Sequence, residues 1–334
     1  MQSPQLDLNS DHPYEALSPS KVLDAVESLD LRVDNRQFAL NSYENRVYQI
    51  GLENSPNIIV KFYRPQRWSE QQILEEHQYC QELVDLEIPV VAPLSFNGKT
   101  LHNFEGFQFA VFPQCLGKPP ELDDLDNLLI MGRFIGRVHL VGATKPFLHR
   151  RKLSIQTLGI DSRNFLLEND FIPKDLLPAY ESLSQDLMTK ISAIFKSHGE
   201  LKQLRIHGDC HPGNILWRDE IPHFVDFDDT VTGPAIQDLW MLLSGDRNQR
   251  QAQLLEIVEG YNEFYDFPVS ELVLIESLRT LRLIHYSAWL AKRWNDPAFP
   301  MSFPWFNTER YWAEHILELR EQMAELDEPV LRIM

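Results

Sequence analysis

The stretch between His207 and Asp229 constrains this chain more than any other part of its sequence. It begins with His207-Gly208-Asp209-Cys210-His211-Pro212-Gly213-Asn214, in which an aspartate and an asparagine follow the pattern Asp-x4-Asn. Two apolar runs come next, and the stretch ends with Asp226-Phe227-Asp228-Asp229. The apolar runs predict a short hairpin that returns a second acidic group towards the first. Single loop aspartates are usually turn formers, so it is the joint spacing that indicates chemistry.

Phosphoryl transfer needs the kinds of groups that this stretch contains. One carboxylate must orient the attacking hydroxyl and accept its proton, oxygen ligands must hold magnesium, and a cation must steady the nucleotide phosphates. Asp209, Asn214 and Asp226 can supply the carboxylate and the oxygen ligands on one wall of a cleft. Lys61, in a predicted strand, can supply the cation. The order of these residues predicts a phosphoryl-transfer site.

The first third of the chain is predicted to be mostly β-structure with one inserted helix. After a proline-interrupted lead-in at residues 1–19, Ser18 and Pro19 indicate the start of a short helix. Strands are expected at residues 47–50, 58–63 and 106–112, the first two as an antiparallel hairpin. Ser69 can cap a helix that continues to Leu86. We assign this β-rich part to residues 20–112.

The remainder, residues 113–334, is predicted to be mainly helical. Apolar residues recur at helical spacing in residues 125–140, 179–197, 249–264 and 271–294. Gly132 and Gly136 lie on one side of the first of these helices and predict a close helix neighbour there.

The composition limits the classes of binding partner and the cellular compartment that we expect for this chain. The formal net charge of -18 disfavours nucleic acid and anionic membrane surfaces as partners, although a local basic patch can exist in an acidic chain. No apolar run reaches the roughly 18 residues of a membrane helix, and residues 1–11 lack the features of a secretory signal. The three cysteines are far apart in the sequence and form no metal-binding pair, and so small and odd a number favours a reducing cytoplasm over a disulfide framework. We expect a cytoplasmic monomer.

Several segments are similar to known families. Residues 207–214 resemble the catalytic loop of the aminoglycoside/choline kinase-like family, His-Gly-Asp-x-His-x-x-Asn, and share its Asp-x4-Asn spacing with protein kinases. Residues 40–48, 60–65, 237–243 and 294–300 resemble the bacterial stress response kinase A family, and the similarity covers nearly the whole chain. The resemblance implies an α+β, two-lobed protein-kinase-like fold, with a β-rich N-lobe and a helical C-lobe. It also implies ATP- and Mg²⁺-dependent phosphorylation of protein Ser and Thr in a stress response.

The resemblance implies roles for individual residues. Asp209 resembles the proton acceptor, and Asn214 and Asp226 resemble the magnesium ligands, Asp226 being counted with Asp209 as catalytic. Lys61 resembles the lysine that contacts the nucleotide phosphates, and Ser42 falls in the nucleotide-covering turn. The adenine edge of ATP is expected against the backbone of residues 111–115.

Three points stay open at this stage. The helix glutamate that pairs with Lys61 is expected to be Glu76, with Glu75 as a competitor. The covering turn, residues 41–46, contains no glycine, so its side chains are expected to replace the free backbone of a glycine-rich loop. The metal segment has Asp228 where protein kinases have glycine, and this residue is either a further metal ligand or a structural acceptor.

For the other conspicuous residues we expect structural roles in preference to chemical ones. His207 and His211 are expected to shape the catalytic loop, and Asp238 to tie that loop to a following helix. The aromatic segment 294–306 is expected to clamp the helical part, in preference to forming a substrate groove. Cys210, beside Asp209, is expected to be a packed thiol; a redox-sensitive thiol is the alternative.

Two rival functions remain. A small-molecule kinase acting on an amino alcohol, sugar or aminoglycoside would use the same catalytic loop, and an acidic pocket would suit a cationic substrate. A non-catalytic binding module on a kinase scaffold is disfavoured because the set Lys61, Asp209, Asn214 and Asp226 is intact.

Overall fold

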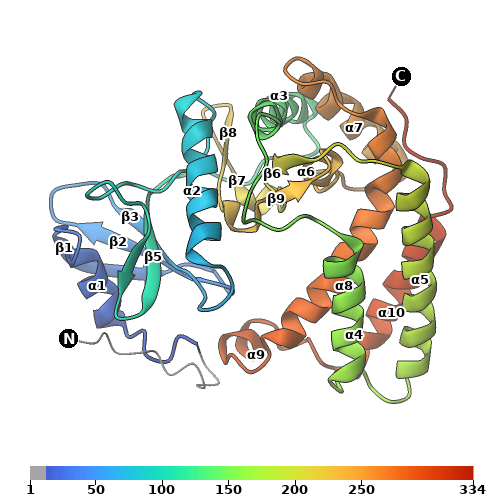
Figure 1. Cartoon of the computed structure of the whole chain (residues 1–334), viewed down its shortest axis with the longest axis horizontal. Helices are drawn as coiled ribbons and strands as arrows, with labels where there is room; N and C mark the ends of the chain where they lie inside the picture. The colour runs from blue at the N-terminus through green and yellow to red at the C-terminus, as the bar shows by residue number, and fades with distance from the viewer. Residues whose placement is uncertain (1–12, 334) are drawn as a thin grey trace. The chain divides into compact units, whose positions relative to one another are not determined.

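The computed structural model describes residues 13–333, which form two compact units (Figure 1). The first unit comprises the chain up to Pro120, together with Phe147–Arg150 and Pro212–Thr230. The second comprises Glu121–Pro146, Arg151–His211 and the chain from Val231 onwards. Of the predicted lead-in, residues 1–12 lie outside the described range. The catalytic-loop segment is shared, since Asp209 belongs to the second unit and Asn214 to the first.

The first unit is built on a five-stranded antiparallel sheet with the order β1-β2-β3-β5-β4. Its strands are β1 (Val33–Ala39), β2 (Arg46–Leu52), β3 (Ile58–Phe62), β4 (His102–Phe104) and β5 (Phe107–Pro113). The predicted β2–β3 hairpin is confirmed, with Val47 opposite Lys61. On its other side Lys61 faces Ala110 of β5. Lys61 therefore lies in the central strand, where neighbours on both sides fix its position.

Two helices and a hairpin complete the first unit. They are α1 (Pro19–Glu27), α2 (Glu70–Asp85), β7 (Ile215–Arg218) and β8 (Ile221–Phe224), with 3-10 turns η2 (Pro212–Asn214) and η3 (Phe227–Asp229) at the ends of the hairpin. Ser18 caps α1, and Ser69 forms a capping box with Gln72 at the start of α2, as predicted for both helix starts. Figure 1 shows α2 between the sheet and the β7–β8 hairpin.

The core of the first unit explains why the sheet holds its register. The side of the sheet towards α1 buries alternating apolar residues, among them Ile50, Val60, Phe62 and Phe109. A one-residue slip would turn this whole set to solvent. Because Val60 and Phe62 point into that core, Lys61 between them points to the opposite face, as strand alternation requires.

The second unit is mainly helical. Its helices are α3 (Leu125–Gly142), α4 (Asp161–Glu168), α5 (Leu177–His198), α6 (Ile236–Trp240), α7 (Arg247–Asn262), α8 (Ile275–Lys292), α9 (Ala298–Ser302) and α10 (Glu309–Glu325), with a π-helical turn η1 (Gln156–Ile160) and a 3-10 turn η4 (Val269–Leu274). A two-stranded antiparallel ribbon pairs β6 (Leu204–Ile206) with β9 (Val231–Gly233). The helix predicted at 271–294 begins later, at Ile275, because η4 takes up its first residues.

The predicted close packing at Gly132 and Gly136 is confirmed. A Cβ atom on Gly132 would lie 2.1 Å from the carbonyl oxygen of Ile257, and one on Gly136 would lie 2.6 Å from that of Tyr261. Both carbonyls belong to α7, so these glycines let α3 and α7 pack backbone to backbone.

The aromatic segment 294–306 packs against its helical neighbours. The ring of Trp294 lies 4.9 Å from that of Phe306, and Phe306 in turn contacts Trp312 of α10. Trp289 of α8 lies 5.1 Å from the ring of Phe299, in α9. These contacts support the clamp interpretation, since they join the end of α8 to α10.

Within residues 13–333, the helices are too short or too polar for any of them to cross a membrane.

Candidate functional site

Lys61 and Asp226 form the centre of the candidate site in the first unit. Lys61 Nζ lies 2.7 Å from Asp226 Oδ1, and Lys61 is only 7% exposed. Burial opposes the lysine charge, but the carboxylates of Asp226, Asp228 and Glu76 outweigh it and raise the pKa of Lys61. Burial would raise the pKa of Asp226, but the Lys61 ammonium brings that pKa below its ordinary value. The lysine is therefore cationic and Asp226 anionic at neutral pH.

The β7–β8 hairpin brings the two predicted magnesium ligands together. Val225 N donates to the carbonyl oxygen of Asn214 at 3.0 Å, which places Asn214 and Asp226 at the base of the hairpin. Asp226 has a left-handed backbone, with φ 58° and ψ 62°, and its side chain is 51% exposed. A carboxylate that is half exposed beside a buried cation can take up a further ligand.

The donor set fits a magnesium ion that is shared with phosphates. Mg²⁺ is usually held by one or two carboxylates together with waters and substrate phosphates. Asp226 and Asn214 fit that pattern, and residues 13–333 contain no cluster of three or more His, Cys, Asp or Glu that could hold a metal by itself.

Asp228 has a structural partner. It is buried, and its Oδ2 forms an ion pair with Arg67, which also donates to Asp229 Oδ1 at 2.7 Å. Its Oδ1 lies 4.0 Å from Lys61 Nζ and has no hydrogen-bond partner. The Arg67 pair gives Asp228 a structural role through Oδ2, and the unpaired Oδ1 is compatible with the alternative role as a metal ligand.

Side chains hold the covering turn in its conformation. Ser42 Oγ donates to the carbonyl oxygen of Asn45 at 3.1 Å, and the buried Asn45 side chain accepts from Arg64 N at 3.0 Å. Glu44 Oε1 lies 3.8 Å from Arg67 Nε. Arg67 therefore connects this turn to the metal segment.

The α2 glutamates take partners that sequence analysis did not anticipate. Glu76 is buried and pairs with Arg150 Nη2 at 2.6 Å, whereas Lys61 pairs with Asp226. Glu75 accepts from the backbone amides of residues 148–150, at 2.9 Å from His149 and 2.7 Å from Arg150. Glu76 thus influences Lys61 through its charge, and Arg150 takes the ion-pairing position that we expected for the lysine.

Arg150 joins three parts of the first unit. Its Nη1 donates to the carbonyl oxygen of Asp228 at 2.6 Å, and its Nε to that of Gln72 at 2.8 Å. With the Glu76 pair, these bonds hold α2 and the metal segment in one arrangement.

Replacing Arg150 with Ala should therefore destabilise the protein by about 3–5 kcal/mol, since it leaves the Glu76 carboxylate buried without its partner. Urea unfolding followed by tryptophan fluorescence measures this loss. The matched control is Arg36→Ala on β1, whose side chain is 62% exposed and should cost little. Equal stability of the two variants would contradict the role of Arg150.

Asp209 lies in a loop of the second unit that Asp238 holds in place. The Asp238 carboxylate accepts from His207 N at 2.7 Å and from Gly208 N at 2.8 Å, and it also lies 3.0 Å from His139 Nε2. This confirms the expected tie between the loop and α6. His207 Nδ1 accepts from Asp209 N at 3.3 Å, which supports a loop-shaping role for this histidine.

The Asp209 carboxylate lies between two basic side chains. Arg282 Nη1 of α8 donates to Oδ1 at 2.5 Å, and His211 Nε2 lies 3.5 Å from Oδ2. Arg282 was not predicted from the sequence. Beside this pair, Cys210 is buried and burial raises the pKa of its thiol, which favours the packed thiol over the redox-sensitive one.

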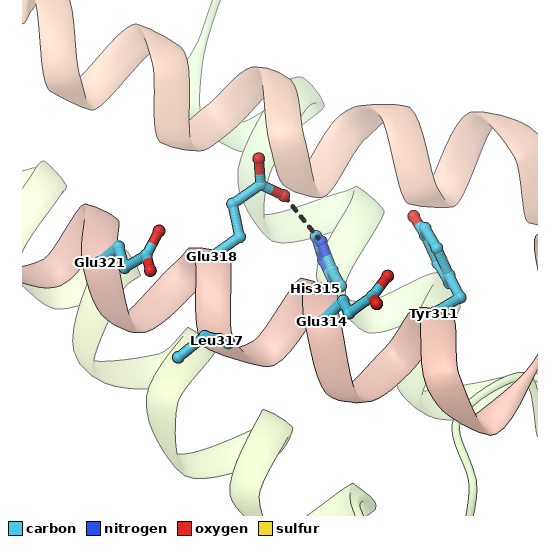
Figure 2. Close-up of a pocket in the computed structure, with 6 residues that line it drawn as sticks. All are labelled: Tyr311, Glu314, His315, Leu317, Glu318 and Glu321. Atoms are coloured by element: carbon cyan, nitrogen blue, oxygen red, sulfur yellow. Dashed lines mark ion pairs between the residues drawn. The ribbon is translucent and has the colours of Figure 1, made fainter. Parts of the chain in front are cut away.

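A shallow surface pocket on α10 has a different character. It has a volume of about 370 Å³ and is lined by Tyr311, Glu314, His315, Leu317, Glu318 and Glu321 (Figure 2). Figure 2 shows that all six side chains extend from one helix. His315 Nδ1 lies 3.9 Å from Glu318 Oε2. None of the predicted site residues lines this pocket.

Comparison with known proteins identifies the family to which this chain belongs. Residues 36–272 match the model of the phosphotransferase enzyme family. The chain is 46% identical over 325 residues to the stress response kinase A of Escherichia coli O157:H7, covering 97% of this chain and 98% of that protein. It is 43% identical over 320 residues to a Salmonella typhimurium protein named serine/threonine protein kinase RdoA, covering 96% and 97%. The chain therefore belongs to the phosphotransferase enzyme family and, within it, to the stress response kinase A proteins.

A solved structure confirms the predicted fold class. An amicoumacin kinase, solved in complex with AMP-PNP, Ca²⁺ and Ami, superposes with a TM-score of 0.72 at 18% identity and covers 96% of this chain and 97% of that one. The fold is the α+β protein-kinase-like fold of these enzymes, and the chain is a kinase of this phosphotransferase class.

Proposed function

We propose that the protein is an ATP- and Mg²⁺-dependent Ser/Thr protein kinase that acts in a bacterial stress response in the cytoplasm. The observation that carries the proposal is the Lys61–Asp226 pair at 2.7 Å, with Asn214 at the base of the same hairpin. The relative named a serine/threonine protein kinase supports a protein acceptor. We further propose that the protein acts as a monomer and that its N-lobe and C-lobe are residues 20–112 and 113–334.

Each residue of the site has a task in this reaction. Lys61 holds the nucleotide phosphates, Asn214 and Asp226 hold Mg²⁺, and Ser42 lies in the turn over the nucleotide. The adenine edge meets the backbone of residues 111–115. Bound Mg²⁺ would neutralise charge on the phosphates.

Asp209 orients the acceptor hydroxyl and takes its proton. The hydrogen bonds from His207 N and Gly208 N to Asp238 fix the loop, so this carboxylate needs no rearrangement of the backbone to act. Arg282 must share or release the carboxylate when an acceptor hydroxyl arrives, because it now donates to Oδ1.

The second candidate function is a small-molecule kinase, which the likeness to the amicoumacin kinase favours. A direct competition separates the two. Purified protein is incubated with γ-labelled ATP, Mg²⁺, proteins of a bacterial extract and a panel of amino alcohols, sugars and aminoglycosides. We expect label on protein Ser and Thr; label confined to a small alcohol would overturn the protein-kinase assignment.

A further inference from the structure

The segment that precedes α1 belongs to the core of the first unit. Tyr14 is 4% exposed and Leu17 is 8% exposed, and both pack with the apolar residues of the sheet. The Tyr14 ring stacks on that of Phe107 in β5, with centroids 6.4 Å apart and planes 7° apart. A buried tyrosine usually places its hydroxyl on a hydrogen-bond partner. The ring of Tyr14 is therefore held in the core, and its hydroxyl has a fixed position.

The Tyr14 hydroxyl contacts the covering turn, residues 41–46. It lies 3.2 Å from the carbonyl oxygen of Glu44, within the turn, and 3.2 Å from that of Phe62, the residue after Lys61. A tyrosine hydroxyl has one proton to donate, so the two carbonyl oxygens share it. The hydroxyl thereby joins the covering turn to the strand that carries Lys61.

The Tyr14 ring supports the same turn through Arg46. The Arg46 guanidinium lies over the ring, 4.4 Å from its centroid, and its Nη1 donates to the carbonyl oxygen of Tyr43 at 3.1 Å. The face of an aromatic ring attracts a cation in this position. Burial raises the pKa of Tyr14 well above its ordinary value, although Arg64 and Arg46 act to lower it. The hydroxyl therefore keeps its proton at neutral pH, and Tyr14 holds the turn with both its ring and its hydroxyl.

Further contacts to the covering turn come from the segment after β3. Arg64 N donates to the Asn45 side chain at 3.0 Å, and Arg64 Nη1 lies 3.5 Å from the carbonyl oxygen of Glu44. The Glu44 carboxylate lies near Arg67 as well. Tyr14 approaches the turn from a separate part of the chain, ahead of α1. The segment before α1 and the segment after β3 therefore hold the turn together.

We infer that Tyr14 is a positioning residue that holds the covering turn in its nucleotide-binding conformation before the nucleotide arrives. The inference rests on the proposed function, which places this turn over the nucleotide. It deepens that function, because it makes the segment before α1 one of the parts that set nucleotide affinity. A loop that must become ordered during binding lowers the affinity, whereas a loop that is ordered beforehand does not.

The test compares Tyr14→Phe with wild type. Phenylalanine keeps the ring, its stack on Phe107 and its contact with Arg46, and it removes only the hydroxyl. We expect the Kd of the ATP analogue AMP-PNP, measured by calorimetry in Mg²⁺, to rise about fivefold, the factor that corresponds to one hydrogen bond. Turnover at saturating ATP should stay within about twofold of wild type, because a bound nucleotide still meets the same groups.

Hydrogen exchange at the backbone amides of residues 41–46 measures the ordering itself. In the free protein Tyr14→Phe should exchange these amides faster than wild type, and saturating AMP-PNP with Mg²⁺ should slow the exchange again. A tyrosine that serves only the core would lower the stability of the protein and leave both the Kd and this local exchange unchanged. The two measurements therefore separate positioning from packing.

The matched control is Tyr311→Phe on α10, in the second unit. The Tyr311 hydroxyl lies 2.7 Å from Ser287 Oγ, so this variant also loses a tyrosine hydrogen bond. It should keep the wild-type Kd and the wild-type exchange of residues 41–46. An unchanged Kd in Tyr14→Phe, or a loss of turnover at saturating ATP in place of affinity, would overturn the inference alone. A wild type that binds no AMP-PNP in Mg²⁺ would overturn the proposed function together with it.

Discussion

Replacing Asp226 with Asn should lower turnover by at least about 10²–10³-fold, the range for removal of one preorganised electrostatic group. Mg²⁺-dependent nucleotide binding should weaken as well, because the variant loses the carboxylate proposed to hold the metal. Asn is the better choice than Ala here, since Asp226 has φ 58°, a left-handed conformation that Asn tolerates. Initial rates and calorimetric titration of nucleotide with and without Mg²⁺ measure the two effects.

Asp219→Asn provides the matched control for this variant. Asp219 also has a left-handed backbone, with φ 53°, and it lies at the tip of the same hairpin with a side chain that is 83% exposed. The control should keep wild-type turnover and affinity. Full activity in a folded Asp226→Asn protein would show that this carboxylate does not hold the metal.

Replacing Asp209 with Asn should give a different pattern. General-base help is typically worth about 10²–10⁴ in rate, so turnover should fall by this factor. Nucleotide affinity should change much less, because Lys61, Asn214 and Asp226 remain intact. The loop itself should stay in place, since Asp238 holds it through the backbone of His207 and Gly208.

Both variants are measured for turnover and for Mg²⁺-nucleotide affinity. A loss of affinity in Asp209→Asn as large as that in Asp226→Asn would contradict the separate roles.

The features that sequence analysis predicted well have local signals. Lys61 lies in a short run of strand-forming residues, Ile58–Phe62, which the sequence alone marks as a strand. Ser69 and Gln72 form a capping box from residues that are neighbours in the chain. Asp209 and Asn214 belong to one continuous motif. In each case the signal that marks the residue spans only a few positions of the chain.

The ion-pair partners that sequence analysis did not predict are distant in the chain. Arg150 lies 74 positions from Glu76, Arg282 lies 73 from Asp209, and Arg67 lies 161 from Asp228. An arginine on a helix or in a loop is by default a solvated surface residue, and no local pattern marks the few that pair with a distant carboxylate. For this reason the sequence predicted Lys61 and the acidic residues of the site but not the arginines that position those acidic residues.

Some elements escaped prediction for a related reason. The strands β6 and β9 have only three residues each, too few for an alternating pattern to be recognised. They pair because the segment that follows the β7–β8 hairpin lies beside the segment that precedes Asp209. In this pairing Ile206 is opposite Val231. Their register depends on contacts between distant segments, which propensity alone does not specify.

Transfer of γ-labelled phosphate from ATP to protein Ser and Thr, measured as an initial rate in Mg²⁺ for wild type, Asp209→Asn and Asp226→Asn, tests the central claim most directly. We expect Mg²⁺-dependent labelling of Ser and Thr by wild type and a loss of at least about 10²-fold in each variant. Near-full turnover by Asp209→Asn on every acceptor would contradict the assignment of this loop as the catalytic one.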